Sequence, residues 1–284
     1  MSVKIVTDST AYIDRKLLKK LDITEASMII DYADRSFPEI VMTNEVFYKS
    51  LEGTEKRPTS SQPSPLTFYH AFGEKVKQGH DVLSILISSK LSGSYYSAVQ
   101  AREMILKEMP EACIEIIDSH TTVMGLGLVV LSAARLAQQG LSLSEVTAET
   151  HNLLTRSKIF FIPKTLEYLK KGGRIGDAAA LLGSLLQITP ILTVNGVVTV
   201  SEKVRTFEKA VKKMMQIFEN DCNAFGVEAI AVHHINCPLE GQELVEELQS
   251  KTGQEVLLSP IGPVIGLHVG PGTLGLAYIL RGER

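Results

Sequence analysis

The chain has little cysteine, no strong charge imbalance and no long apolar run. Its three cysteines lack metal-ligand spacing, so we expect buried free thiols in a reducing compartment. The net charge is −3 without a basic block, which argues against nucleic-acid or membrane surfaces. The longest apolar stretch, near Val123 to Ala134, is well short of the roughly 20 residues that span a bilayer. The chain opens with a strand, so we expect no signal peptide and a soluble cytoplasmic protein.

Several motifs of catalytic and cofactor-binding proteins are also absent. The sequence has no GxxxxGK[ST] loop for ATP, no GxSxG nucleophile elbow and no HExxH or paired histidine spacing for a metal. The run from Gly270 to Gly275 matches GxGxxG, but only nine residues follow it, too few to supply an acidic ribose contact. We therefore expect neither a cofactor nor a metal.

What is present is an alternation of strands and helices in the first half of the chain. Strands are expected at 3–6, 81–87 and 114–117, and helices at 93–109 and 122–139, which predicts βαβ units and a parallel sheet. The strands end in TDST, ISSK and IDSH. These three turns, which we call the hydroxyl-rich edge, meet at the carboxyl ends of the strands, where ligands bind in open α/β sheets. They predict a polar ligand site.

The second of these turns is the richest in hydroxyls. It reads ISSKLSGSYYS, so Ser92 and Gly93 stand at a helix start, where free N–H groups and the helix dipole favour an anion. For one such turn alone, the simpler interpretation is that Ser92 only caps the helix. The preceding segment 58–63 is expected to be extended, because residues before proline avoid the helical region, and it brings Ser60 and Ser61 beside this turn.

The rest of the chain predicts a smaller second domain. We place an N-terminal α/β domain at 1–158, with a small excursion at about 25–56, and a C-terminal α+β domain at 159–284. A hairpin is predicted at Asn195-Gly196, which supplies the positive φ of a tight turn, and joined to βα units it suggests a mixed sheet. A helix is expected to end at Gly172-Gly173, with another helix after the linker.

Three basic side chains of this second domain are candidates for binding phosphate or carboxylate. Arg174 and Arg205 each flank a turn, and His268 lies in a glycine-dense segment where the backbone can approach a ligand. An arginine in a loop is more often simply solvated. The apolar helix that contains Gly125 and Gly127 is, on sequence grounds, a central buried helix.

The motifs TDST, SSQPSP, ISSKLSGSYYSA, IDSHTTVMGLG, LKKGGRIGDAAALLGSLLQITPIL, EKVRT and IGPVIGLHVGPGTLGL occur in that order. Together they resemble the DegV family over nearly the whole chain apart from residues 25–56. The resemblance implies a long-chain fatty acid, such as palmitate, bound between an N-terminal α/β domain and a C-terminal α+β domain. Some members serve as the lipid-carrying subunit of bacterial fatty acid kinase and hand the carboxylate to a separate subunit that uses ATP.

The resemblance also assigns residues. Ser60, where threonine is usual in the family, and Ser92 would hold the carboxylate, while His268, Arg174 and Arg205 would support the acyl-phosphate state and the encounter with the kinase. The expected fatty-acid site comprises Ser60, Ser61, Ser92, Gly93 and His268. Both arginines are expected to lie away from the hydroxyl-rich edge. The helix at 123–134 would form a tunnel wall, with Met124 adapting to the acyl chain.

Two classes of function remain open. The first is a monomeric lipid carrier without catalytic groups, whose partners are a long-chain fatty acid and the catalytic subunit of a fatty acid kinase. The second is a serine-dependent hydrolase or a small-molecule kinase-like enzyme that uses Ser92 or His268 directly. The missing P-loop, metal cluster and complete triad favour the carrier.

Overall fold

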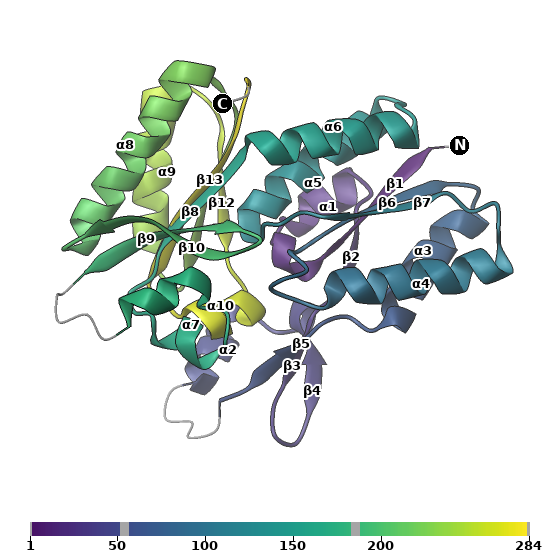
Figure 1. Cartoon of the computed structure of the whole chain (residues 1–284), viewed down its shortest axis with the longest axis horizontal. Helices are drawn as coiled ribbons and strands as arrows, with labels where there is room; N and C mark the ends of the chain where they lie inside the picture. The colour runs from purple at the N-terminus through teal and green to yellow at the C-terminus, as the bar shows by residue number, and fades with distance from the viewer. Residues whose placement is uncertain (1, 52–56, 183–187, 283–284) are drawn as a thin grey trace.

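A parallel sheet of four strands forms the N-terminal half of the molecule (Figure 1). The computed structural model describes residues 2–51, 57–182 and 188–282. In sheet order, the strands are β2 (Thr24–Ala26), β1 (Val3–Asp8), β6 (Asp81–Leu86) and β7 (Ile114–Asp118). Their apolar residues are buried on both faces, as a parallel sheet requires. The predicted α/β fold is confirmed, with β1, β6 and β7 as direct neighbours.

Helices cover both faces of this sheet. One face packs against α3 (Pro65–Lys77) and α4 (Ser94–Glu108), and the other against α1 (Arg15–Lys20), α5 (Val123–Gln138) and α6 (Leu143–Arg156). Helix α5 is buried almost all round, because its other side contacts the C-terminal sheet. Glycine permits close packing around the helix, since a Cβ at Gly127 would lie 2.5 Å from the carbonyl oxygen of Ala11, just after β1. The predicted central helix is confirmed.

The C-terminal half is built on a mixed sheet of six strands. In sheet order they are β10 (Val197–Val204), β9 (Thr189–Asn195), β8 (Ser157–Ile162), β13 (Thr273–Leu280), β11 (Val227–Ile235) and β12 (Val256–Pro260). Only β11 and β12 pair in parallel. Helices α8 (Phe207–Phe225) and α9 (Pro238–Thr252) cover one face, and α5 lies on the other. The expected domain boundary at 158/159 falls inside β8.

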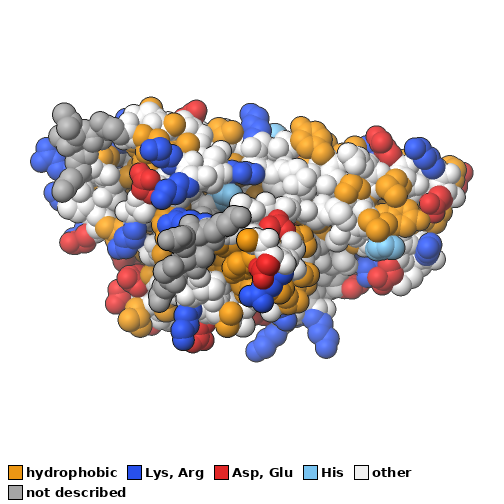
Figure 2. Space-filling view, turned by 90° about the horizontal axis from the view of Figure 1, so that it is seen from below, with side chains coloured by type: hydrophobic (Ala, Val, Ile, Leu, Met, Phe, Trp, Pro, Cys, Tyr) orange, Lys and Arg blue, Asp and Glu red, His pale blue; other side chains and the backbone are white. Residues whose placement is uncertain are grey.

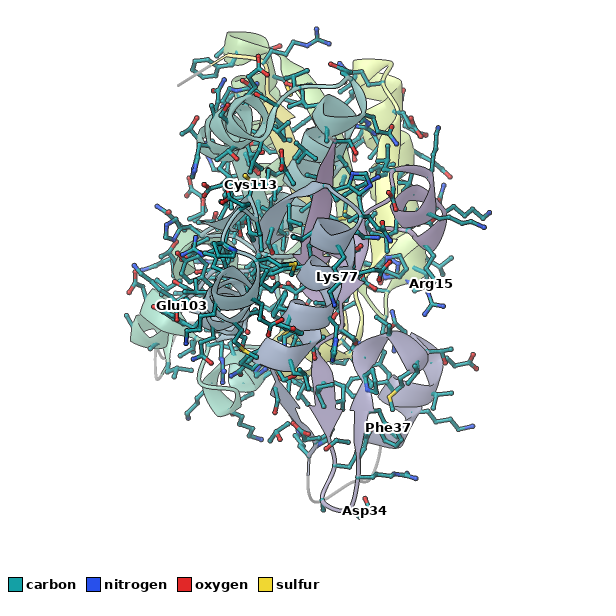
Figure 3. The ribbon with its side chains drawn as sticks, turned by 90° about the vertical axis from the view of Figure 1, so that its right-hand side faces the viewer. Arg15, Asp34, Phe37, Lys77, Glu103 and Cys113 are labelled. Carbon is teal, nitrogen blue, oxygen red and sulfur yellow. The ribbon has the colours of Figure 1, made fainter. Side chains whose placement is uncertain are left out.

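The excursion contributes β3 (Ile29–Asp31) and β4 (Ser36–Pro38) to a third, small sheet of order β4-β3-β5, and β5 (Thr59–Ser61) follows the excursion. The 3-10 turn η2 (Glu39–Val41) and helix α2 (Asn44–Leu51) lie between β4 and β5. The β3–β4 hairpin extends away from the parallel sheet, with Asp34 at its far end (Figure 3). Because Ile30 pairs with Ser60, this sheet fixes the register of the extended segment that carries Ser60.

The β9–β10 hairpin connects the two halves. Asn195 pairs with Val197, and Gly196 alone has a positive φ of 77°, so the turn is tighter than the predicted Asn-Gly turn. The N–H of Gly196 donates to the carbonyl oxygen of His120 at 2.6 Å, and its own carbonyl accepts from Ser88 Oγ at 2.6 Å. The hairpin tip is therefore docked on the hydroxyl-rich edge.

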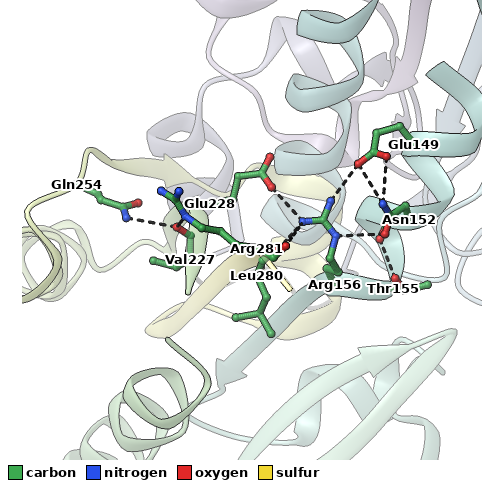
Figure 4. Close-up of polar contacts among 9 residues, drawn as sticks. All are labelled: Glu149, Asn152, Thr155, Arg156, Val227, Glu228, Gln254, Leu280 and Arg281. Carbon is green, nitrogen blue, oxygen red and sulfur yellow. Dashed lines mark hydrogen bonds and ion pairs between the residues drawn. The ribbon is translucent and has the colours of Figure 1, made fainter. Parts of the chain in front are cut away.

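A second connection lies at the C-terminal end of α6 (Figure 4). The side chain of Arg156 is buried, and its Nη1 donates to the carbonyl oxygen of Leu280 at 2.6 Å. The same guanidinium pairs with Glu149 and with Glu228, each at 3.1 Å. These contacts attach α6 to the ends of β11 and β13.

Other details differ from expectation. Of the three cysteines only Cys237 is buried, whereas Cys113 is exposed, so the prediction of buried thiols was wrong for Cys113. After α7 (Glu167–Lys171) the chain forms a short 3-10 helix, η3 (Gly176–Leu181), and part of the helix predicted beyond it lies outside the described residues. Within the described ranges, no helix is long and apolar enough to cross a membrane.

Candidate functional site

A pocket lies between the two halves and is lined by the mixed sheet, the small sheet, helix α10 (Pro263–Val269) and the turn that follows β6. Most of its lining is aliphatic or aromatic. The polar side chains that line it are those of Ser60, Ser61, Gln62, Ser92, Thr122, Arg174, His233, His268 and Thr273. The pocket therefore combines an apolar wall with a limited set of hydrogen-bonding groups, the arrangement typical of sites for small amphipathic ligands.

Two predicted site residues form a direct pair across the pocket. Ser60 Oγ, from β5, lies 2.8 Å from His268 Nε2, although the two residues are 208 positions apart. His268 belongs to helix α10, which lies within the glycine-dense segment of the sequence. The glycine that gives its ring room is Gly172, where a Cβ would lie 2.3 Å from His268 Nδ1.

The environment of His268 keeps the ring neutral. Burial and, to a smaller extent, the nearby guanidinium of Arg174 lower the pKa of His268 to about 4. Its Nδ1 has no hydrogen-bond partner among the described residues. A neutral imidazole protonated at Nε2 donates to Ser60 Oγ and leaves the hydroxyl proton of Ser60 available for a ligand.

The turn before α4 places Ser92 in the pocket lining. Gly93, not Ser92, is the N-cap of the helix, and Ser92 Oγ lies 3.0 Å from Ser94 Oγ. Gly93 is not itself in the lining. A Cβ at Gly93 would lie 2.8 Å from Gln62 Nε2, so this glycine allows the segment that carries Ser60 to pack on the turn.

The acidic residues of the hydroxyl-rich edge brace this turn. Asp8 Oδ2 accepts from the N–H of Ile87 at 3.0 Å, and Asp118 Oδ1 accepts from the N–H of Ser89 at 3.1 Å. Burial raises the pKa of Asp8, against the opposing effect of its hydrogen bonds. The three turns thus converge as the sequence predicts, but their carboxylates hold the backbone and do not line the pocket.

The two arginines lie in different places. Arg174 lines the pocket, and its Nε donates to the carbonyl oxygen of Leu91 at 3.3 Å, within the turn that carries Ser92. The expectation that Arg174 lies away from the hydroxyl-rich edge was therefore wrong. Arg205 follows the end of β10, is exposed and lies outside the lining.

Sequence reasoning missed or misplaced other lining residues. Helix α5 contributes Val123, and Thr122 just before it, but not Met124; the methionine of the pocket is Met28. Thr122 is the N-cap of α5, and its buried Oγ1 has no partner among the described residues. A threonine before an apolar helix is a recognisable N-cap signal. For His233, on β11, the sequence offered no comparable signal.

The fold and the pocket define a class of α/β proteins in which a parallel and a mixed sheet form two halves with a pocket between them. The sequence matches the family described as "Uncharacterised protein, DegV family" over residues 2–281, and the chain belongs to the DegV family. A DegV domain-containing protein of Clostridium acetobutylicum is 46% identical over 280 residues, covering 98% of both chains.

Solved structures agree with this assignment. A DegV family protein from Thermus thermophilus, described by its fatty acid binding, superposes with a TM-score of 0.89 at 31% identity, covering 99% of this chain and 100% of that one. A stearic-acid-binding protein from Eubacterium ventriosum superposes with a TM-score of 0.88 at 27% identity, covering 98% of each chain.

Proposed function

We propose that this protein binds a long-chain fatty acid in the pocket between its two halves. The observation that carries the proposal is the Ser60–His268 pair, with Ser92 in the same largely apolar pocket. Each methylene group removed from water contributes about 0.8 kcal/mol, so a long acyl chain supplies most of the affinity. The fatty acids bound by the Thermus and Eubacterium proteins support the same ligand class here.

The polar groups suit the carboxylate of such a ligand. A buried carboxylate is costly unless it is hydrogen-bonded, and the hydroxyls of Ser60 and Ser92 supply donors. His268 orients the Ser60 hydroxyl, and Arg174 at the same turn contributes a positive charge. Serine in place of the family's usual threonine at position 60 keeps the hydroxyl and removes one methyl group from the wall.

The first test is the content of the purified protein. Denaturing extraction followed by mass spectrometry should yield a fatty acid close to one equivalent per chain. If none is extracted, and added palmitate and oleate also fail to bind the delipidated protein in calorimetry, the proposal is wrong.

The carboxylate end is tested by substitution. Ser92→Ala removes one hydrogen bond to a charged group, worth about 1.5–3 kcal/mol, and should weaken fatty-acid affinity by roughly 10- to 150-fold. Ser89→Ala is the matched control, because Ser89 belongs to the same turn but is not in the lining. Equal affinities of the Ser92→Ala variant and the wild type would remove Ser92 from the site.

We also propose that the protein presents the bound carboxylate to a separate kinase subunit. Support comes from the basic face around α7, where Lys and Arg side chains gather over the C-terminal half (Figure 2). The exposed basic residues in and around α7 and at the end of β10 are Lys164, Lys170, Lys171, Arg174, Lys203 and Arg205. Arginine pairs bidentately with phosphate or carboxylate oxygens, so these side chains suit an acyl-phosphate or an acidic partner.

A substitution at Arg205 tests fatty-acid binding and acyl-phosphate formation separately. Because Arg205 lies outside the pocket lining, Arg205→Ala should leave fatty-acid affinity within about twofold and reduce acyl-phosphate formation with the cognate kinase subunit and ATP. Lys107→Ala, which removes an exposed charge from α4 on the other half, should change neither quantity. Parallel losses of affinity and turnover in Arg205→Ala would show that the arginine serves binding alone.

A serine hydrolase is the second candidate, because Ser60 and His268 have the spacing of a nucleophile and its base. The lowered pKa of His268, about 4, makes it a weak base at neutral pH. Among the described residues no carboxylate bonds to its Nδ1. We expect no turnover of p-nitrophenyl esters; turnover that Ser60→Ala abolishes would favour the hydrolase.

We further propose that the carrier acts as a monomer in the cytoplasm. The exposed thiol of Cys113 suits a reducing compartment. Light scattering coupled to size exclusion tests the oligomeric state, and an assembly larger than 31.1 kDa would contradict it.

A further inference from the structure

The pocket contains a second histidine, far more deeply buried than the polar groups at its rim. His233, on β11, is 3% exposed, whereas Ser61, Gln62 and Arg174 are exposed. It pairs in register with Gly275 of β13, and a Cβ at position 275 would lie 2.1 Å from His233 Nε2. The imidazole therefore lies against the bare backbone of the central strand and is held there by packing.

The position of His233 along β11 gives its depth. Side chains two residues apart share a face of a strand and are separated by about 6.6 Å. On this face of β11, Ile235 and His233 line the pocket, while Ala231 does not. His233 thus stands at the inner end of the lining on its strand, among side chains that would surround the acyl chain of a bound fatty acid.

A polar group in such a place is unusual when one of its ring nitrogens lacks a hydrogen bond. His233 Nδ1 is buried and has no partner among the described residues. Burial and the neighbouring His234 lower the pKa of His233 to about 3, so the ring is neutral at physiological pH. A neutral imidazole presents one N–H donor and one acceptor nitrogen, and it can therefore bond to a hydroxyl group in either direction.

We propose that His233 is a specificity-determining residue that admits fatty acids carrying a hydroxyl group on the acyl chain. This inference rests on the proposed function, since it names a subclass of the same ligand. A purely aliphatic pocket rejects a hydroxylated chain, because burying a hydroxyl without a partner costs about 5- to 150-fold in affinity. His233 removes that penalty for a hydroxyl that lies opposite its Nδ1, and hydrocarbon elsewhere on the chain packs against the apolar wall.

The test compares stearic acid with 10-hydroxystearic and 12-hydroxystearic acids by calorimetry on delipidated protein. The measured quantity is the ratio of Kd for the better hydroxystearate to Kd for stearate. We expect a ratio no greater than about 3 in the wild type and a rise of at least tenfold in His233→Leu, with stearate affinity retained. Ile235→Val, at the neighbouring lining position, should leave the ratio unchanged.

A ratio that rises less than tenfold in His233→Leu, or a wild-type ratio above 3, overturns the inference. If His233→Leu does not fold, the wild type alone decides by nitrogen-15 NMR: the Nδ1 resonance of His233 should shift between the stearate and hydroxystearate complexes, and identical resonances overturn the inference. Failure of the wild type to bind stearate is a different result, because it overturns the proposed function itself.

Discussion

Because the carboxyl group of Glu39 is buried, we predict that Glu39→Gln stabilises the protein at neutral and alkaline pH. Glu39 is 3% exposed and accepts hydrogen bonds from Ser9 Oγ at 2.5 Å, Tyr12 Oη at 2.7 Å and the N–H of Val264 at 2.8 Å. It thereby connects the end of β1, the excursion and the first turn of α10. Despite these three donors, burial raises the pKa of Glu39 from 4.5 to about 7.

The sign and size of the effect follow from proton linkage. Because the folded pKa is the higher one, the folded protein keeps its proton between pH 4.5 and 7 while the unfolded chain loses it. The contribution of the protonated carboxyl is fully present below pH 4.5 and is lost as pH rises through 7. By pH 8 a shift of this size has removed about 3 kcal/mol of stability, most of it between pH 5 and pH 8.

The pH dependence of the wild type's free energy of unfolding cannot be assigned to Glu39 alone, because other groups titrate in the same range and change the stability in the opposite direction. The wild type must therefore be compared with a variant of Glu39. His233 and His268 have lowered pKa values, so their contributions are present above pH 6.5 and are lost as pH falls. Urea unfolding of the wild type and of Glu39→Gln, at several pH values from 5 to 8, isolates the effect of Glu39. The advantage of the amide should grow by about 2–3 kcal/mol across this range.

Glu145→Gln is the control for this experiment. Glu145 is exposed in the capping box of α6, and its hydrogen bonds with Ser142 lower its pKa, so its difference from the wild type should change only in acid. A constant difference between the wild type and Glu39→Gln from pH 5 to 8 would refute the reasoning. It would mean that the three donors keep Glu39 ionised throughout.

Two further substitutions test how the structure holds the site and the two halves together. Gly172→Ala places a methyl group against His268, at a residue whose φ of −76° tolerates alanine. The pKa of His268, followed by NMR, should rise from about 4 toward 6.5. Gly73→Ala is the control, because Gly73 has open space around it and its substitution should leave the pKa of His268 unchanged. Arg156→Met leaves the Leu280 carbonyl without its partner and should destabilise the protein by about 2–3 kcal/mol in urea unfolding. Arg135→Met, at an exposed position on α5, should have little effect, and similar losses from both variants would contradict a special role for Arg156.

Elements with a strong local pattern were predictable from the sequence. The strands β1, β6 and β7 combine short apolar runs with polar turns, and Ser64 before Pro65 gives an N-cap and a proline at the first position of α3. Short elements held mainly by tertiary contacts were not predictable. Helix α10 has seven residues, and its N–H at Val264 is satisfied by a side chain of the distant excursion.

The candidate site shows the same division. Ser60 and Ser92 could be identified as site residues from the sequence, because each lies in a short segment that carries several hydroxyl groups. The contact between Ser60 and His268, and the space that Gly172 leaves for the ring, depend on how the two halves pack. Local sequence carries no information on that packing. The position of Arg174 was misjudged for the same reason, since its reach to Leu91 crosses from one half to the other.

The order in which the pocket wall is synthesised has a consequence for the life of the protein. Met28, Ser60 and Ser92 leave the ribosome well before His268 and Thr273, which complete the wall. Until then, the side of α5 that contacts β8, β11 and β13 has no cover and presents aliphatic side chains to the cell. The nascent N-terminal half is therefore expected to be a substrate of chaperones, and the pocket wall is complete only in a finished chain.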